Sequence, residues 1–570
     1  MYATLFTASL LGLSAAFPSF PSPQLSPRAT CSGNTADTRS EWCDYSIDTD
    51  YTSESPDTGV TREYWFELTE TTASPDGYER YVQAINGSIP GPTIIADWGD
   101  TVVVHVTNSL SSSTNGTSIH FHGIRQNYTN QNDGVSSITQ CPTPPGSEIT
   151  YTWKAEQYGS TWYHSHFGLQ AWQGVFGGIL INGPATADYD EDLGHVFLND
   201  WSHETVDALY LTAELGGPPT LDNGLINGTN VYGDDDDDDQ TGTRFSVSVT
   251  EDSSYRMRIV NAAVDSHFRF MIDNHTMTVI AMDLVPITPY TTDVLSIGMG
   301  QRYDIIITAD QAAVADSFWI RAIPQAACSE NDSTDNIKGI LYYGDSTTTP
   351  TTSRTDSYTS GLDCLDEDLS NLVPYISQTI SSATDEGEQD ATVGFNDDDL
   401  FKWYINSTTM VVSWSDPTLM QVYDNVSTFD TSDAVIKLPN ADEWVYLVIE
   451  TTFTVPHPIH LHGHDFLVLA QDEGTYSSDV TLNFDNPPRR DTAMLPSAGY
   501  LAIAFKTDNP GAWLMHCHIG WHTSEGFALQ FVERESEIAD LLDYDSLSDN
   551  CDAWSTYETA DSVEQEDSGI

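Results

Sequence analysis

The amino-acid sequence predicts an all-β protein made of several sandwich or barrel domains. Short runs of β-branched and aromatic residues are separated by Gly, Pro and Asn, as in residues 101–107, which follow the turn Trp98-Gly99-Asp100. Alternating apolar runs recur later, at residues 245–249 and 304–307. A chain of 570 residues holds about three to four domains, at roughly 150 residues per domain.

Composition divides the chain into consecutive segments. An apolar run that ends in Ser14-Ala15-Ala16 is typical of a secretion signal with a small-residue cleavage site. A Pro/Ser-rich stretch follows it, and a later Thr/Ser/Asp-rich stretch is typical of an interdomain linker. In chain order we therefore expect a signal peptide at residues 1–16, a candidate pro-segment at 17–30, β-domains at 31–183 and 184–344, a linker at 345–362 and a third β-domain at 363–570.

Acidic side chains dominate the composition. Lys and Arg number 20 against 85 Asp and Glu, which gives a formal net charge of −65. This charge repels nucleic acids and anionic lipid surfaces, so we expect neither as a partner. Beyond the N-terminal run, no stretch has the roughly 18 apolar residues that a membrane span needs. We therefore expect a soluble, exported protein.

Two further observations favour export. The sequence contains eight Asn-x-Ser/Thr acceptors for N-glycans, at Asn86, Asn115, Asn127, Asn227, Asn274, Asn331, Asn406 and Asn425. It also contains seven cysteines, an odd number that leaves one unpaired. The other six can form three disulfides in an oxidising compartment, in any of 15 connectivities. We therefore expect a secreted, extracellular glycoprotein.

The stretch His516-Cys517-His518-Ile519-Gly520-Trp521-His522 carries the strongest chemical signal. A thiolate joined by imidazoles is a donor set that binds copper strongly. On an extended strand Cys517 points to one face while His516 and His518 point to the other. One strand can therefore contact two metal sites, and electrons that reach the sulfur can pass to the flanking imidazoles through the backbone. This arrangement predicts a redox enzyme.

Histidines recur in pairs with one residue between them. Four His-x-His pairs account for eight of the sixteen histidines: His120/His122, His164/His166, His460/His462 and His516/His518. On a strand, this spacing places both imidazoles of a pair on one face. Eight imidazoles can serve three metal ions as three, three and two, while His457 and His522 join Cys517 in a His₂Cys set of the blue-copper kind. We interpret the other six histidines as structural or solvent-exposed residues.

These motifs resemble those of the multicopper oxidases, and among them the secreted laccases of ascomycetes. The matching motifs are His120-Phe-His122-Gly, Trp162-Tyr-His164-Ser-His166, His457-Pro-Ile-His460-Leu-His462-Gly and His516-Cys-His518-Ile-Gly-Trp-His522. Weaker similarity includes Asn86-Gly-Ser-Ile-Pro-Gly-Pro92, Leu225-Ile-Asn-Gly228 and Asn486-Pro-Pro-Arg-Arg-Asp491. The resemblance covers nearly the whole chain after about residue 31.

The resemblance implies three cupredoxin-like Greek-key β-domains and four copper ions per chain. His457, Cys517 and His522 would hold a type 1 copper, and His120 and His460 a type 2 copper. The ligands of a type 3 pair would be His122, His164, His166, His462, His516 and His518. The resemblance also pairs Cys31 with Cys43, Cys141 with Cys551 and Cys328 with Cys364. The final residues Asp567-Ser-Gly-Ile570 resemble a C-terminal plug.

The function implied is that of a laccase. One-electron oxidation of small phenolic or aromatic amine substrates at the type 1 copper would be coupled to the four-electron reduction of dioxygen to water. We expect the protein to be a monomer. Lignin fragments, pigment precursors and plant defence phenols all remain candidate substrates. A ferroxidase of the same family is an alternative. A copper-binding electron carrier without oxidase activity is another, although it leaves the eight paired imidazoles unused.

Three further residues are candidates for the chemistry. Phe527 stands ten residues after Cys517, at the family's axial position, where a ring without a lone pair favours a high potential. Asp133 matches an acidic position beside the cluster and is a candidate proton relay, or simply a turn Asp before Gly. Asp265 matches a position at the substrate edge and is a candidate acceptor of the phenolic proton, or a strand-end Asp that binds local N–H groups. Phe527 can equally be a core residue.

Overall fold

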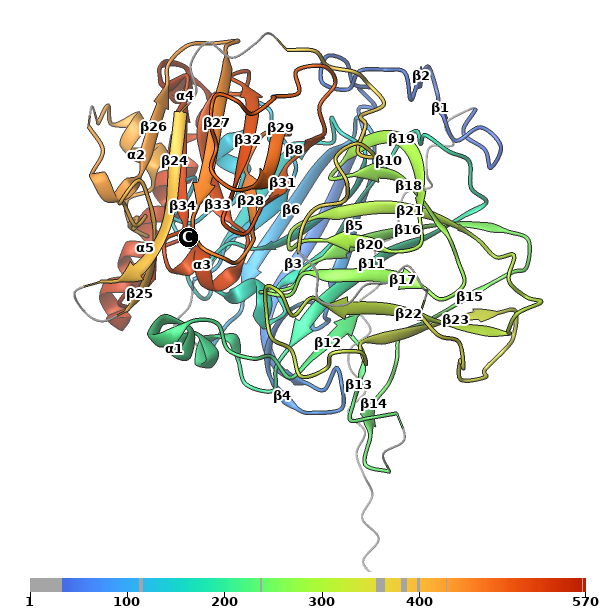
Figure 1. The fold of residues 1–570 in the computed structure, drawn as a ribbon. Helices are drawn as coiled ribbons and strands as arrows, with labels where there is room; N and C mark the ends of the chain where they lie inside the picture. Colours follow the sequence, from blue (N-terminus) through green and yellow to red (C-terminus); the bar gives the residue numbers. More distant parts are fainter. Residues whose placement is uncertain are drawn as a thin grey trace, which may run out of the picture. The chain divides into compact units, whose positions relative to one another are not determined.

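Strands dominate the computed structural model (Figure 1), which describes residues 33–111, 116–235, 238–354, 364–380, 387–396, 400–426, 428–565 and 567–570. The expected signal peptide, the expected pro-segment and part of the expected linker lie outside these residues. The described segments belong to one unit of the chain, Cys31–Ile570. Two small hairpins accompany the larger sheets: β1 (Glu41–Trp42) with β2 (Tyr45–Ser46), and β13 (Val231–Tyr232) with β14 (Thr241–Gly242).

The first pair of sheets lies in the first third of the chain. One sheet has the order β4-β3-β6-β8, made of Arg80–Ile85, Thr61–Ala73, Thr101–Asn108 and Glu148–Lys154. The other has the order β5-β10-β9-β7, made of Gly91–Asp97, Phe176–Asn182, Gly159–Ser165 and Ile119–His122. Inward-facing residues of both sheets, among them Val104 and Phe121, share one core.

The second pair follows. Its six-stranded sheet has the order β12-β11-β16-β21-β18-β19: Asn223–Ile226, Glu191–Trp201, Ser254–Asn261, Arg302–Thr308, Met277–Met282 and Val285–Thr292. Its five-stranded sheet has the order β15-β23-β22-β17-β20: Ser246–Val249, Lys338–Tyr343, Ser317–Pro324, Phe268–Ile272 and Leu295–Ile297. Helix α1 (Val206–Gly216) is inserted between β11 and β12.

The third pair holds the sulfur motif. Its six-stranded sheet has the order β25-β24-β27-β32-β29-β30: Phe401–Ile405, Gly387–Phe395, Trp444–Thr451, Gly499–Lys506, Phe466–Glu473 and Arg489–Arg490. Its five-stranded sheet has the order β26-β34-β33-β28-β31: Val435–Leu438, Ala528–Glu533, Gly511–Cys517, His457–Leu461 and Thr492–Leu495.

The same strand pattern occurs in all three pairs. Each of the six sheets joins one parallel pair of strands to antiparallel neighbours, and the parallel pairs are β3/β6, β5/β10, β11/β16, β15/β23, β24/β27 and β26/β34. Three copies of one Greek-key topology therefore make up the chain, which confirms the predicted all-β fold class. The second and third pairs share a continuous core that includes Ile259 of β16 and Leu529 of β34.

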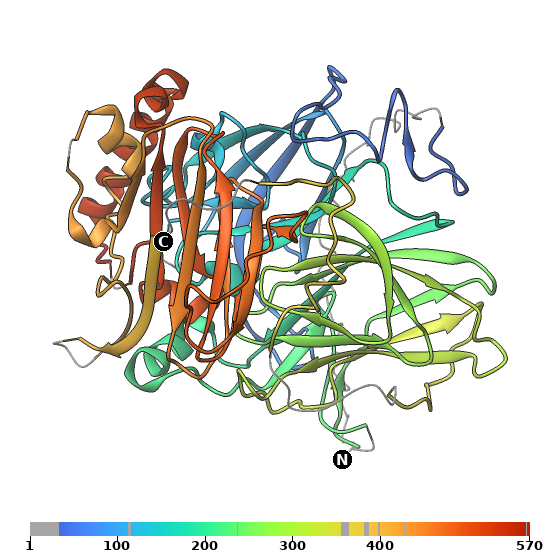
Figure 2. The same cartoon turned by 45° about the horizontal axis from the view of Figure 1, so that its top comes forward.

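Short helices complete the third part of the chain. Helices α2 (Thr418–Tyr423), α4 (Glu535–Leu541) and α5 (Tyr544–Asp561) lie outside the orange and red strands, away from the green ones, as Figure 2 also shows. Helix α3 (Gly520–Ser524) follows β33 directly, so the turn after Cys517 brings His522 back toward the strand. Three 3₁₀ turns occupy Asn130–Asn132, Gln170–Gln173 and Thr431–Asp433.

Candidate metal centres

One buried thiol lies against two imidazoles. Cys517 ends strand β33, His457 begins the neighbouring strand β28, and His522 lies in α3. The Cys517 Sγ atom is 3.8 Å from His457 Nδ1 and 3.5 Å from His522 Nδ1. A thiolate with two imidazoles is the donor set of a trigonal copper site.

The alternation of side chains at the end of β33 separates this site from a second group of histidines. The rings of His516 and His518 lie on the side opposite to the thiol. His516 lies with His166 and His462, and His518 lies with His122 and His164. A single stretch of three residues therefore borders both groups, as the sequence pattern predicts.

Eight imidazoles gather between the first and third pairs of sheets. They come from the ends of β7, β9, β28 and β33 and from the residues that follow these ends. Their nitrogen atoms form three sets, in each of which the ligand atoms lie within 4.8 Å of one another: His120, His122 and His460; His122, His164 and His518; and His166, His462 and His516. All four His-x-His pairs therefore meet in one cluster.

Backbone carbonyl groups fix several of these rings. Four imidazoles donate from Nδ1 to carbonyl oxygens 2.8 to 2.9 Å away, those of His120, His164, His460 and His516. Their Nε2 atoms are buried and have no hydrogen-bond partner among the described residues. Buried polar atoms are normally paired, so a set of unpaired nitrogens that face one another indicates metal ligands.

Burial also keeps the donors free of protons that would compete with a metal. It lowers the pKa of His457 to about 3 and that of His516 to about 4. Burial raises the pKa of the Cys517 thiol well above its usual value, so a thiolate at this position needs a cation beside it. Neutral imidazoles and one thiol in a buried setting fit bound copper at both sites.

Asp133 lies beside the cluster. It follows the 3₁₀ turn Asn130–Asn132 and precedes Gly134, whose left-handed φ of +77° and close approach to the Ile119 carbonyl leave no space for a side chain. The Asp133 carboxylate accepts a hydrogen bond from His462 Nδ1 at 2.9 Å, and its carbonyl oxygen accepts one from His120. Its Oδ1 atom lies 3.2 Å from His120 Nδ1. The residue is therefore both a turn Asp and an anchor of two cluster imidazoles.

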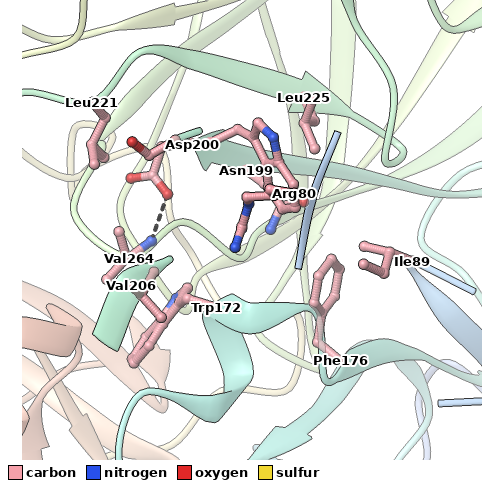
Figure 3. A pocket seen from close by; sticks show the side chains of 12 residues that line it. Arg80, Ile89, Trp172, Phe176, Asn199, Asp200, Val206, Leu221, Leu225 and Val264 are labelled. Carbon is pink, nitrogen blue, oxygen red and sulfur yellow. Dashed lines mark hydrogen bonds between the residues drawn. The ribbon is translucent and has the colours of Figure 1, made fainter. Parts of the chain in front are cut away.

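Asp265 lies in a loop that packs on α3. The loop is fixed from one side by the Asp200 carboxylate, which accepts hydrogen bonds from the backbone N–H groups of Val264, Asp265 and Ser266, all at 2.9 Å. Figure 3 shows the bond to Val264 at the edge of a small cavity. From the other side, the Gly520 N–H donates to the Val264 carbonyl oxygen at 2.9 Å. Burial, followed by the charge of Asp200, raises the pKa of Asp265 to about 8.

Phe527 packs beside the thiol site. Its ring centroid is 5.2 Å from that of His457 and 6.4 Å from that of His522, and Trp403 stacks on it at 4.8 Å. The side chain is also part of the shared core. Phe527 therefore fills the space next to the sulfur site with a group that offers no lone pair.

Three further residues at the histidine cluster, Asp491, Thr492 and Arg302, have no role assigned by the sequence motifs. Thr492 begins strand β31, which pairs with β28, and Asp491 directly precedes it. Both residues contact cluster histidines. Arg302 comes from the second pair of sheets and binds the Asp491 carboxylate with two hydrogen bonds. Asp491 was visible only as the end of a motif that matched the family, and nothing in the sequence around Arg302 pointed to the cluster.

Disulfides and the chain end hold this region together. Cys141 is bonded to Cys551 of α5, and Cys328 to Cys364, as the resemblance implied, while Cys517 is free. Cys43 is also disulfide-bonded, and its expected partner Cys31 lies outside the described residues. The final residues are buried: the Ser568 N–H donates to the Ser524 carbonyl oxygen of α3 at 3.1 Å, and the Ser137 hydroxyl donates to the Gly569 carbonyl oxygen at 2.7 Å.

Comparison with known proteins matches this architecture and these motifs to one family. Models of multicopper oxidase domains match residues 67–186, 193–346 and 393–537. Laccase-2 of Botryotinia fuckeliana is 49% identical, and the alignment covers 100% of both chains. The laccase of Neurospora crassa is 40% identical over 90% of this chain and 85% of its own length.

Solved structures agree with these matches. The crystal structure of the laccase from Botrytis aclada has a TM-score of 0.89 and 48% identity, covering 94% of this chain and 99% of that one. A multicopper oxidase that functions in iron import has a TM-score of 0.76 and 28% identity, covering 90% of this chain and 97% of that one. The chain belongs to the multicopper oxidase family. Within that family its high-identity relatives include ascomycete laccases, and its cofactor is copper, four ions per chain.

Proposed function

We propose that this protein works as a laccase, which oxidises phenols and aromatic amines one electron at a time and reduces dioxygen to water. The position of Cys517 between His516 and His518 carries this proposal, because it places the thiol site and the histidine cluster on either side of one residue. Copper ions bound at these sites would accept and release single electrons, and the four of them together would supply the four electrons that, with four protons, turn one dioxygen into two waters. The laccases among the relatives support the same reaction.

The resemblance to the family implies the ligand sets, and the groups of donor atoms are compatible with them. We assign His457, Cys517 and His522 to the type 1 copper, and His120 and His460 to the type 2 copper. The type 3 ligands are His122, His164, His166, His462, His516 and His518. The separate groups of His164 with His518 and of His166 with His462 and His516 support this division.

The electron enters through the imidazole that is nearer to solvent. His522 is 4% exposed, whereas His457 and Cys517 are fully buried. Helix α3, which carries His522, lies beside the loop that holds Asp265 and beside helix α1. A phenol that reaches this edge can give up its electron without contact with dioxygen.

Two carboxyl groups handle protons in this proposal. Asp265 accepts the phenolic proton as the electron leaves, which avoids a charged phenol radical. Asp133 passes protons to the oxygen-reducing cluster, and its contacts with two cluster imidazoles, at 3.2 Å from His120 Nδ1 and 2.9 Å from His462 Nδ1, support that role.

A variant without the sulfur tests the proposal. In Cys517→Ser the intense sulfur-to-copper colour and the oxidation of dimethoxyphenol should both disappear, because a hydroxyl does not replace a thiolate as a copper ligand. Copper bound by the cluster histidines should remain. A serine variant that oxidises the phenol at the rate of the unaltered protein would refute the proposed route.

A ferroxidase is the competing function within the same family. The similar structure with a role in iron import has 28% identity, against 48% for the Botrytis aclada laccase. Turnover of dimethoxyphenol compared with turnover of Fe²⁺ distinguishes the two. A laccase prefers the phenol, and a strong preference for Fe²⁺ would favour the ferroxidase.

We further propose that the protein is exported as a glycosylated monomer without a membrane anchor. The apolar run at residues 1–16 and the glycan acceptors support export, and among the described residues no helix is long and apolar enough to cross a membrane. Asn127, Asn274, Asn406 and Asn425 are exposed and suit glycans. Asn331 is buried and donates to the Asn223 carbonyl oxygen at 2.8 Å, so we expect it to stay unmodified.

A further inference from the structure

His122 is oriented differently from most of its neighbours in the cluster. Its Nε2 atom lies 3.2 Å from Asp491 Oδ1 and 3.3 Å from Thr492 Oγ1. Its Nδ1 atom is buried and has no hydrogen-bond partner among the described residues, whereas His120, His164, His460 and His516 present Nε2 to the cluster. The carboxylate of Asp491 therefore fixes a tautomer in which Nε2 carries the proton and Nδ1 offers the lone pair.

The Asp491 carboxylate is itself fixed by a buried arginine from the second pair of sheets. Arg302 Nη1 lies 2.6 Å from Asp491 Oδ1, and Arg302 Nη2 lies 2.6 Å from Asp491 Oδ2. This bidentate geometry sets both the position and the plane of a carboxylate, which a point charge cannot do. The Arg302 side chain is 1% exposed, so no solvent competes for its donors.

Two glycines show how closely the ion pair of Arg302 and Asp491 approaches the histidines. A side chain on Gly300, whose φ is +83°, would press on His518 at 2.9 Å and on His122 at 3.2 Å. A side chain on Gly123, in the motif His120-Phe-His122-Gly, would collide with the Arg302 guanidinium and the Asp491 carboxylate. Both glycines leave room for the arginine and its partner to approach the cluster.

Arg302 is in turn held rigidly. Its backbone N–H donates to Asp283 Oδ1 at 2.7 Å, and its Nη1 donates to the Gly300 carbonyl oxygen at 3.0 Å. The other oxygen of Asp283 accepts a hydrogen bond from Arg490 Nε at 2.8 Å, one residue before Asp491. The same ion-pair network therefore fixes both Arg302 and the chain segment that carries Asp491.

We propose that Arg302 is a positioning residue for the copper cluster. It acts through Asp491 on His122 and, through the Asp491 carbonyl oxygen, which lies 2.8 Å from His460 Nδ1, on the backbone that orients His460. The second pair of sheets supplies none of the proposed copper ligands, yet it completes the cluster in this way. The inference rests on the proposed function, because it concerns the orientation of ligands assigned there.

The test compares two arginines of the same domain. Arg302→Lys keeps the charge but loses the bidentate contact. Arg321→Lys makes the same change at a buried arginine of β22 that contacts Asp273 at 2.8 and 2.9 Å and does not touch the cluster. The unaltered holoprotein is measured first for four coppers and for phenol oxidation, so that a failure of the proposed function is recognised separately.

Copper release to a chelator and the spectra of the two sites are the decisive measurements. We expect Arg302→Lys to lose cluster copper about 10–100-fold faster than the unaltered protein, since partners of metal-bound histidines typically contribute that much. Its electron paramagnetic resonance signal from the cluster should change, its blue sulfur signal should not, and its KM should rise for dioxygen rather than for phenol. Arg321→Lys should show none of these changes.

Equal copper release and equal cluster spectra in the two lysine variants would overturn the proposal. If Arg302→Lys does not fold, Asp491→Asn replaces it, because the amide has the same shape but offers the arginine only one acceptor oxygen. The asparagine variant should release cluster copper faster with its blue signal unchanged. An asparagine variant with normal copper retention and normal spectra would equally contradict the role of the pair.

Discussion

At the thiol site, the side chain next to the sulfur controls how strongly the oxidised metal is stabilised. The phenyl ring of Phe527 lies there, stacked on Trp403 and 5.2 Å from the His457 ring. We expect Phe527→Met to lower the reduction potential of the type 1 copper, because a thioether sulfur donates a lone pair to the cupric form. A redox titration of the blue absorbance measures this. Phe527→Leu is the matched control and should keep a high potential, and a methionine variant with an unchanged potential would contradict the assignment.

The carboxyl group of Asp265 predicts a pH dependence. Burial raises its pKa to about 8, so the group is neutral below that pH and accepts a proton only above it. The kcat/KM for a phenol should therefore rise as the pH approaches 8, and Asp265→Asn should lose about 10²-fold at that pH, in the range of general-base contributions.

An aromatic donor that releases no proton on oxidation serves as the control for Asp265. Its kcat/KM should be nearly the same in the unaltered protein and in Asp265→Asn, because no base is needed. Steady-state rates between pH 4 and about 9 give both profiles. A loss of equal size for both donors would show that Asp265 acts on the site structure and not on the phenolic proton.

At the scale of single elements, helix α5 is held in place by a disulfide bond. The disulfide from Cys551 to Cys141 connects it to the first pair of sheets across 410 residues of sequence. The buried end of the chain follows α5 and contacts α3, which carries His522. The position of the chain end next to the copper sites therefore depends on this helix.

Removal of that disulfide should loosen the tail as well as the fold. We expect the double variant Cys141→Ser with Cys551→Ser to lower the free energy of unfolding by about 2–5 kcal/mol, as is typical for native disulfides. Limited proteolysis should then cut within the last residues first. The double serine variant of Cys328 and Cys364 is the control, because that bond closes a loop of 36 residues that does not include the tail. Equal protection of the tail in both variants would show that other contacts hold it.

The sequence predicts the histidine pairs on the strands better than it predicts the residues that contact them. The ends of β7, β9, β28 and β33 carry the histidine pairs, and a spacing of two on a strand is local information that the sequence displays directly. The partners of these rings are not local. Asp133 reaches His462 across 329 positions, and Arg302 reaches Asp491 across 189. Such contacts depend on how the sheets pack. The sequence pattern therefore predicted the paired histidines, and the resemblance placed Asp133 beside them, but neither predicted the contact of Arg302 with Asp491.

Over the whole molecule, the three parts share one sheet pattern but contribute different residues to the candidate metal centres. The fold class followed from short strands and turn residues, the domain segments followed from chain length and composition, and the resemblance implied the same three domains. The first and third parts hold the histidines proposed as copper ligands. The second part contributes Arg302, which contacts Asp491 beside the cluster, and Asp200, which holds the loop of Asp265. The basic residues are scarce, 20 against 85 acidic ones, and several are buried in ion pairs at these contacts, such as Arg302 with Asp491 and Arg490 with Asp283.

In the proposed function, one sulfur site and one histidine cluster work together as a single four-electron unit. An oxygen electrode combined with optical detection of the oxidised substrate measures this coupling in the copper-loaded protein. We expect four one-electron substrate oxidations for each dioxygen consumed, with no hydrogen peroxide released. Two oxidations per dioxygen with peroxide as the product, or substrate oxidation without any consumption of dioxygen, would contradict it.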